Sequence, residues 1–333
     1  MRPKILKAAC FIIAGALVAS IIIIVYSSKQ IVSPPRRSIQ EYHQSWLNSP
    51  ETHGIQIESN FYLNGSAPCL LVSPRKNEQP SERGGIIRHQ LTKMGYTLEK
   101  HGNIRGTLVL LHGRKGRKED LLPVAERFCA VGFRCLLPDL PGHGESSNQK
   151  VYYATKAHEE DYVNRLLQEA ITRHNLSPDP IGIWGISMGG AFAIRNVISN
   201  PQQWKCAVIV SSFDSLDEVI QKQFHSRAWI FGEALFRGVD FTLRKNHDFD
   251  LSITKPVAWI ANTNIPTMIA HGTSDSLIPL EKGQNLYNAI PHQEKRWIEV
   301  DGGNHDNVLV TEMPLYATMA SWFFDYMFKD SAN

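Results

Sequence analysis

Residues 181–199 read IGIWGISMGGAFAIRNVIS. The stretch opens with an apolar run, Ile181–Trp184, which is typical of a buried strand, and it ends with helical spacing over Met188–Ser199. Between the two lies the glycine-rich segment Gly185–Gly190. A serine on a sharp strand-to-helix turn projects its Oγ above the sheet, and glycines two residues before and after it remove side chains that would clash in the bend. The order predicts a strand, a tight turn carrying Ser187, and a helix whose free N–H groups favour a developing anion.

Apolar runs and helical patterns alternate in the same way over much of the chain. Strands that are separated by helices pair in parallel through right-handed crossovers, so we expect an α/β fold with a doubly wound, mostly parallel sheet. We expect strands at Gly54–Leu63, Cys69–Val72, Thr107–Leu111, Phe133–Leu137, Ile181–Trp184, Ala207–Val210, Pro266–Ala270 and Arg296–Val300, and helices at Asp120–Val131, Tyr162–Arg173, Met188–Ser199, Leu280–Ala289 and about Leu315–Phe328.

The alternation lapses between Phe213 and Asn264, over about fifty residues that are rich in aromatic side chains. We expect this segment, 213–264, to be a helical insertion in the domain. Packed helices explain such a composition by themselves, while an apolar cover over a nucleophile would form an acyl-binding pocket.

The formal charge of +3, from 35 Lys and Arg against 32 Asp and Glu in 333 residues, is unevenly distributed. No acidic residue precedes Glu41, and without the six bases found there the remainder holds 29 bases and 32 acids. The basic balance therefore does not indicate a nucleic-acid partner. The six bases are Arg2, Lys4, Lys7, Lys29, Arg36 and Arg37.

The first of these basic residues flank an uncharged apolar segment, Ala8–Tyr26. At about 1.5 Å per residue its length suits the roughly 30 Å hydrocarbon core of a bilayer. A cleaved signal peptide and a buried core helix are the alternatives. Ala14–Ala16 fits a cleavage site, but the following Ile21–Val25 is apolar where a cleavage region is polar. We expect an anchor at residues 1–28, a linker at 29–50 and one catalytic domain at 51–330. The positive-inside rule slightly favours an exported body.

A serine nucleophile needs a base, and the base needs an orienting carboxylate. Two later strands end at such residues: Pro266–Ala270 leads to Asp275, and Arg296–Val300 leads to His305. The carboxyl ends of parallel strands converge, so we expect these side chains to meet Ser187. Asp214, which follows Ala207–Val210, and Asp306 are the alternative carboxylates.

Three further histidines, His112, His143 and His271, adjoin glycines at the same edge. We expect them to hold loops through ring N–H bonds to the backbone. Their spacing is not that of a zinc site, and the five cysteines form no C-x-x-C pair. The proposed chemistry requires no metal, nucleotide or flavin, and we expect no cofactor.

The motifs LVLLHG, PDLPGHGES, GISMGG, HGTSDSLIP and GGNHD, in this order, resemble the α/β-hydrolase fold superfamily of serine hydrolases, in particular its esterases and lysophospholipases, over roughly Thr107 to Phe328. The resemblance implies that Ser187 is the nucleophile, His305 the base and acid, and Asp275 the acidic member. It implies an oxyanion hole made by two backbone N–H groups, those of Met188 and Arg114. It also makes the insertion 213–264 a cap.

The segment Arg114–Lys118, RKGRK, departs from the small or polar residues common in the oxyanion loop of this superfamily. It is either a solvated turn or an electropositive lip that attracts anionic substrates or lipid headgroups.

We therefore expect a hydrolase of carboxylic esters that works through an acyl-enzyme on Ser187. The anchor and the cap favour lipid-derived substrates such as monoacylglycerols or lysophospholipids. Thioesterase, amidase and acyltransferase reactions use the same groups and remain alternatives. A membrane-tethered binding protein without catalysis is the alternative of another class. The expected partners are a small ester or lipid and, through residues 1–28, a membrane.

Overall fold

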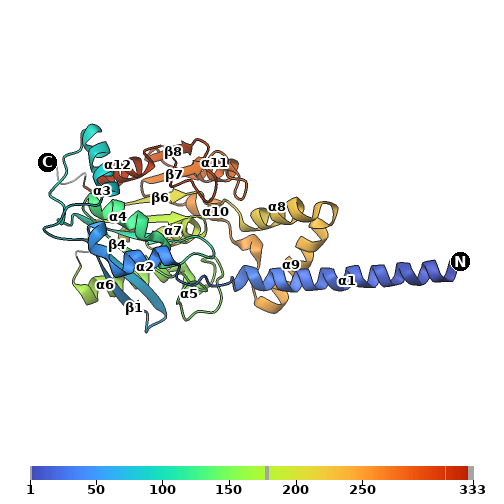
Figure 1. Cartoon of the computed structure of the whole chain (residues 1–333). Helices are drawn as coiled ribbons and strands as arrows, with labels where there is room; N and C mark the ends of the chain where they lie inside the picture. The colour runs from blue at the N-terminus through green and yellow to red at the C-terminus, as the bar shows by residue number, and fades with distance from the viewer. Residues whose placement is uncertain (1, 177–179, 312, 329–333) are drawn as a thin grey trace.

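The computed structural model describes residues 2–176, 180–311 and 313–328, with the side chains of residues 2–6 and 9 left out (Figure 1). Within them the chain forms an eight-stranded sheet of order β1-β2-β4-β3-β5-β6-β7-β8. β2 runs antiparallel to β1 and β4, and the remaining neighbours are parallel. The predicted doubly wound, mostly parallel sheet is confirmed. The strands are β1 Ile55–Tyr62, β2 Ala67–Pro74, β3 Gly106–Leu111, β4 Phe133–Pro138, β5 Ile181–Ile186, β6 Cys206–Val210, β7 Thr267–Gly272 and β8 Lys295–Val300.

Helices cover both faces of this sheet (Figure 1). The core on one face is built with α6 and α7, and the core on the other with α3, α4 and α12. The inner strands β2–β7 are almost wholly buried between these layers, which explains their apolar sequences, whereas the edge strands β1 and β8 are partly exposed and contain polar residues. The helices of the body are α2 Glu41–Asn48, α3 Glu82–Lys93, α4 Leu122–Ala130, α5 Ala157–Glu160, α6 Tyr162–His174, α7 Met188–Ser199, α10 Pro256–Ile260, α11 Leu280–Ala289 and α12 Leu315–Met327.

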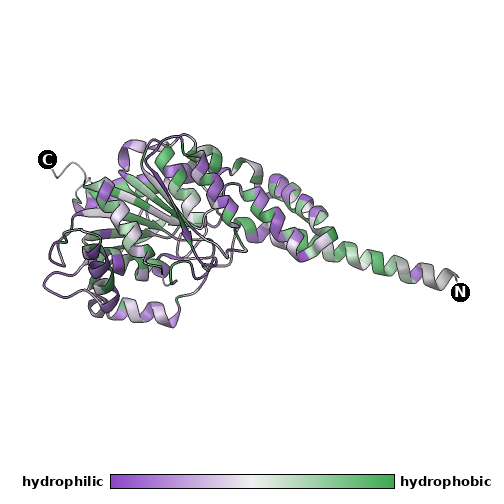
Figure 2. Cartoon of the chain, turned by 90° about the horizontal axis from the view of Figure 1, so that it is seen from above, coloured by the Kyte–Doolittle hydropathy of each residue, from purple (hydrophilic) through white to green (hydrophobic). Residues whose placement is uncertain are grey.

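The N-terminal helix α1, Arg2–Val32, extends away from the body and is apolar along most of its length (Figures 1 and 2). Its segment Cys10–Val32 is long and apolar enough to cross a membrane. Its last turn is part of the body, because Ile31 and Val32 are buried. There Tyr153 Oη donates to the Ile31 carbonyl at 3.0 Å and Val151 N–H donates to the Val32 carbonyl at 2.8 Å.

The segment predicted as a linker, 29–50, differs from that expectation. Its first residues complete α1, and α2 follows within it with His43 and Trp46 buried. The prediction rested on the polar, proline-containing composition of the stretch, whereas a few apolar side chains spaced along it attach it to the body. The segment is packed structure rather than a free tether.

The predicted insertion 213–264 is helical. Its helices α8, Leu216–Ala228, and α9, Gly232–His247, project from the body beside α1 (Figures 1 and 2). α10 lies in the same stretch but packs against α7 and α11 of the body. The projecting part is therefore shorter than the insertion, and we use the word cap for α8, α9 and the turn between them.

Candidate active site

Ser187 lies on the turn between β5 and α7 with φ 54° and ψ −121°. A serine rarely adopts a positive φ, so the surrounding structure must hold it there. Its N–H donates to the Val210 carbonyl at 2.9 Å, and its carbonyl accepts from Ser212 Oγ at 2.9 Å. The turn is thus fixed by the end of β6, the neighbouring strand, and by the residues that follow it.

The glycines around Ser187 leave no room for a side chain. A Cβ on Gly185 would lie 2.3 Å from the Gly189 carbonyl oxygen, and a Cβ on Gly189 would lie 2.2 Å from the Leu111 carbonyl oxygen. Both distances join a new carbon to backbone atoms, which cannot move aside cheaply. The bend therefore requires glycine at both positions.

Ser187, His305 and Asp275 form a continuous hydrogen-bonded relay. His305 Nε2 lies 3.1 Å from Ser187 Oγ, and His305 Nδ1 lies 2.7 Å from Asp275 Oδ2. With the carboxylate accepting from Nδ1–H, Nε2 is free to accept the Ser187 hydroxyl proton. Asp275 is buried, whereas the His305 side chain is 18% exposed. Ser187 is also buried, with 8% of its surface exposed, so His305 is the most accessible member of the three.

The second oxygen of Asp275 is fixed by its own loop. Asp275 Oδ1 accepts the N–H of Leu277 at 3.0 Å and the N–H of Ile278 at 2.8 Å. These bonds orient the carboxylate so that Oδ2 points to His305.

The alternative carboxylates have other contacts. Asp214 Oδ2 accepts from Asn285 Nδ2 at 2.7 Å and lies 3.4 Å from Lys282 Nζ, so it is tied to α11. Asp306 is exposed, and its N–H donates to Asn304 Oδ1 at 2.9 Å. The structure brings Asp275, and not these two, to His305.

The two predicted oxyanion donors lie on either side of Ser187 in the fold. Met188 begins α7, where N–H groups have no partner within the helix. Arg114 follows Gly113, whose Cβ position would be 3.4 Å from Ser187 Cβ. Among the described residues, no hydrogen bond occupies the backbone N–H of Met188 or of Arg114. Both groups are available to an anion at Ser187.

The basic segment 114–118 is mostly not a surface feature. Arg117 and Lys118 are buried, and Lys118 Nζ lies 3.0 Å from both Asp139 Oδ2 and Glu119 Oε1. Burial opposes the charge of Lys118, but the surrounding carboxylates, Asp139 foremost, raise its pKa. Both expectations for this segment, a solvated turn and an electropositive lip, are therefore wrong for these two residues. Besides the adjacent Glu119, their partners Asp139 and Glu145 are distant in sequence, so the charge run alone could not reveal the cluster.

Arg114 and Lys115, in the loop after β3, remain accessible to solvent. The pKa of Lys115 is lowered, first by repulsion from Arg114, then by burial and by Arg227 of α8. Sequence reasoning missed Arg227 because only the fold returns the cap to this loop. The Arg114 side chain is held by neutral groups: it donates to the Gln30 carbonyl and, at 3.1 Å, to Tyr153 Oη. The side chains of Arg114, Lys115 and Arg227 thus place three positive charges near one another, between the loop after β3 and the cap.

The three remaining histidines hold loops, as expected. His112 lies 2.8 Å from the Gly113 carbonyl through Nδ1 and accepts the Leu140 N–H at 3.0 Å through Nε2. His143 Nδ1 is 2.9 Å from the Pro141 carbonyl, and His271 Nε2 is 2.9 Å from the Ile278 carbonyl. Burial lowers the pKa of all three, to about 3 for His143.

In the described part of the chain, no three His, Cys, Asp or Glu side chains gather in a group that could hold a metal ion.

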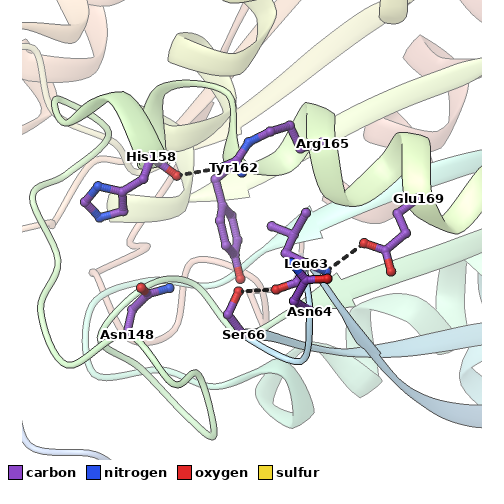
Figure 3. Close-up of a pocket in the computed structure, with 8 residues that line it drawn as sticks. All are labelled: Leu63, Asn64, Ser66, Asn148, His158, Tyr162, Arg165 and Glu169. Carbon is purple, nitrogen blue, oxygen red and sulfur yellow. Dashed lines mark hydrogen bonds between the residues drawn. The ribbon is translucent and has the colours of Figure 1, made fainter.

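A cavity of about 300 Å³ lies between the β1–β2 turn and α6, away from Ser187 (Figure 3). Two of its polar groups are paired: Glu169 accepts the Leu63 N–H at 2.7 Å, and Arg165 donates to the His158 carbonyl at 2.8 Å. The first contact attaches the β1–β2 turn to α6, and the second joins α6 to α5. They describe a structural depression rather than a second reactive site.

Comparison with known proteins gives one family model and several remote relatives. The model, described as serine aminopeptidase, S33, matches residues 102–258. Lipase 1 of Psychrobacter immobilis is 25% identical over 260 residues, which cover 67% of this chain and 79% of the lipase. An uncharacterized 31.7 kDa protein of Escherichia coli is 26% identical over 246 residues, which cover 62% of this chain and 85% of that protein.

Among solved structures, an esterase of Pyrococcus furiosus superposes with a TM-score of 0.62 at 16% identity, over 89% of this chain and 98% of the esterase. An acylaminoacyl peptidase of Pyrococcus horikoshii gives 0.59 at 14% identity, over 87% of this chain and 44% of the peptidase. At such identities these likenesses establish the fold, which is common to an esterase and a peptidase. Sheet order, strand–turn–helix elbow and family match agree, and the chain has the α/β-hydrolase fold.

Proposed function

We propose that this protein is a membrane-anchored serine hydrolase that cleaves carboxylic esters through an acyl-enzyme on Ser187. The observation that carries the proposal is the relay of 3.1 Å and 2.7 Å contacts from Ser187 Oγ through His305 to Asp275. In the reaction Ser187 attacks the carbonyl, His305 takes the hydroxyl proton and gives it to the leaving group, and Asp275 stabilises the imidazolium. Water then repeats the cycle on the acyl-enzyme.

The tetrahedral intermediate carries its negative charge on the former carbonyl oxygen. The free N–H groups of Met188 and Arg114 are the proposed donors to that oxygen. One such donor is worth about 2.7–4 kcal/mol in the transition state of related chemistry. The N-terminal end of α7 adds the favourable sign of its dipole.

We propose residues 1–28 as a retained anchor, 51–330 as the hydrolase domain and 213–264 as the insertion that supplies the cap. Retention is supported by the end of α1, because Ser28, Ile31 and Val32 are buried against the body. Cleavage within the apolar segment would leave that packed end without the helix that leads into it.

The test is covalent labelling by a fluorophosphonate, comparing the full chain with Ser187→Ala. We expect a label on the unchanged chain and none on the variant. A folded protein whose labelling does not depend on Ser187 refutes the proposal. A second control, Ser212→Ala, removes a nearby hydroxyl that bonds the Ser187 carbonyl and should retain the label.

Amide hydrolysis is the second candidate, favoured by the serine aminopeptidase description of the matching family model. The amine released from an amide is a poorer leaving group than the phenol released from an aryl ester. The comparison therefore needs an amide and an ester with the same acyl group. We expect kcat/KM for a p-nitrophenyl ester to exceed that for the p-nitroanilide of the same acid. A peptide p-nitroanilide with a free amino terminus that is cleaved faster than any ester would favour the aminopeptidase instead.

A further inference from the structure

The cap and α1 pack against each other along a face of small side chains. Ser28 is buried and its Oγ lies 3.4 Å from the Val239 carbonyl of α9. Gly238 approaches Ile24 so closely that a Cβ on the glycine would lie 2.4 Å from Ile24 Cδ1. Ser20, one helical turn before Ile24 on the same side of α1, is partly buried. The close approach makes α1 a structural neighbour of the cap.

The two helices run in the same direction. Gly238 lies beside Ile24, and further along α9 the chain reaches Phe249, whose ring stacks on Tyr153, the residue bonded to Ile31. The turn before α9 is therefore displaced toward the N-terminal part of α1, by up to about 10 Å from Ile24. This turn, Trp229–Phe231, is the cap tip (Figure 1).

The part of α1 that the cap leaves bare is too short to span a bilayer. Residues 11–19 are all exposed, Ser20 is partly buried, and the cap contacts α1 at Ile24 and Ser28. The helix from Arg2 to Ala19 is only about 27 Å long, and the part from Ala8 to Ala19 is only about 18 Å long. Both lengths are shorter than the hydrocarbon core of a bilayer, which is roughly 30 Å thick. A bilayer spanned by α1 must therefore extend to the level of the cap.

The cap tip has the chemistry of a bilayer interface. Trp229, Ile230 and Phe231 are 83%, 68% and 65% exposed, an uncharged run that no part of the described chain covers. Tryptophan is enriched at the level of lipid headgroups. Charged side chains within two turns, among them Arg227 and Arg237, limit the depth of the tip to the interface, because charge is costly in the hydrocarbon core.

We propose that the cap tip Trp229–Phe231 inserts into the interface of the bilayer that α1 spans, and that the active site therefore acts on acyl esters resident in that bilayer. The inference rests on the proposed hydrolase activity and anchor, and it specifies the partner and the substrate class. α1 packs against α9 and so holds the cap in place. The cap extends from its tip at the lipid surface to the loop of Arg114 and Lys115, where Arg227 of α8 lies near Lys115. An ester held in the membrane reaches Ser187 without crossing bulk water.

The location is tested by fluorescence in nanodiscs of phosphatidylcholine. Cys10 is the exposed cysteine and the other four are buried, so Cys10→Ser followed by Ile230→Cys gives one reactive thiol for an environment-sensitive label. Lys93→Cys, exposed on α3 at the far end of the body, is the matched control. We expect nitroxide lipids to quench the label at position 230 and iodide to quench the label at position 93. Equal quenching of both by iodide overturns the proposal.

The substrate class is tested with Trp229→Ser/Phe231→Ser, neither of which belongs to the proposed relay. Phe61→Ser, which removes an exposed aromatic ring from β1, is the control. Against a long-chain fluorogenic ester in phosphatidylcholine vesicles we expect about a tenfold loss of kcat/KM for the double variant only. Hydrolysis of soluble p-nitrophenyl butyrate should change less than twofold. An equal loss on both esters, or none on the vesicle ester, overturns the inference. If the chain without substitutions shows no Ser187-dependent hydrolysis of p-nitrophenyl butyrate, the proposed function is refuted instead.

Discussion

Replacing Asp275 by asparagine tests the relay more sharply than deleting it. Asp275 Oδ1 accepts two N–H groups, from Leu277 and Ile278, and an asparagine can keep both bonds only with its amide oxygen at that position. Its NH2 group must then face His305 Nδ1, where Oδ2 stood 2.7 Å away. Since the NH2 is a donor, Nδ1 must become the acceptor.

This reversal moves the imidazole proton to Nε2, the atom that faces Ser187 Oγ. The ring can no longer accept the hydroxyl proton in that tautomer, and the negative charge that stabilised the imidazolium is lost. A change of this kind costs about 10⁴ in kcat, or about 5.5 kcal/mol in activation free energy. The variant should keep its fold, because the loop retains its two hydrogen bonds.

The assay is kcat for p-nitrophenyl butyrate, with the melting temperature measured on the same samples. Asp214→Asn is the matched control: its carboxylate bonds Asn285 and Lys282, and we expect less than about a threefold change in kcat. A kcat for Asp275→Asn within tenfold of the unchanged chain would refute the relay. The large loss in Asp214→Asn instead would give the acidic role to Asp214.

Three further changes have defined outcomes. Gly189→Ala should lower the free energy of unfolding by about 3 kcal/mol or prevent folding, since its Cβ would lie 2.2 Å from a backbone oxygen. Gly85→Ala is the control, because its Cβ would meet no atom within 4 Å, and its urea midpoint should fall little or rise. Lys115→Ala/Arg227→Ala should lower the ratio of kcat/KM for anionic over neutral esters by about two- to tenfold, most strongly at low salt. An unchanged ratio argues against an attractive opening. Because the pKa of buried His143 is about 3, the native state binds fewer protons than the unfolded state between about pH 6.5 and pH 3, and stability falls as pH falls through this window. His143→Asn should flatten that slope by up to about 1.4 kcal/mol per pH unit in urea titrations at pH 5 and pH 7, and an identical slope would contradict the assignment.

The elements that the sequence predicts well are those whose signal is local. All eight expected strands are present. The inner strands are short apolar runs between turns, and a strand buried on both faces needs little else. The edge strands β1 and β8 mix apolar and polar residues because part of their surface is exposed. The elbow at Ser187 was predictable because its glycines stand within six residues, although the backbone oxygen that excludes a side chain at Gly189 belongs to Leu111 of β3. The meeting of Asp275 and His305 with Ser187 followed from a topological rule, that parallel strands present their carboxyl ends at one edge.

The missed elements have signals that depend on distant contacts. α3 contains the pair Gly84 and Gly85, which disfavours a helix in isolation. In the fold Gly84 lets α3 approach α4, since a Cβ there would lie 2.7 Å from Ala130 Cβ, and Ile87 and Leu91 become buried. Tertiary packing overrides the local propensity. The same holds for Lys118, whose carboxylate partners lie as far along the chain as Glu145.

The end of α1 shows why an apolar N-terminal segment should not be treated as a mere tether. The carbonyls of Gln30 and Ile31 accept from Arg114 and Tyr153, and Arg114 Nε donates to Tyr153 Oη as well. Hydrogen bonds to a charged group contribute about 1.5–3 kcal/mol each. A rotation of α1 by a fraction of a turn would therefore release the side chain of Arg114, whose N–H we propose as an oxyanion donor. The same helix packs against α9 through Ser28. Its position is therefore set by the oxyanion loop and by the cap together, and an unrelated span of equal hydropathy would restore attachment to a membrane without restoring either contact.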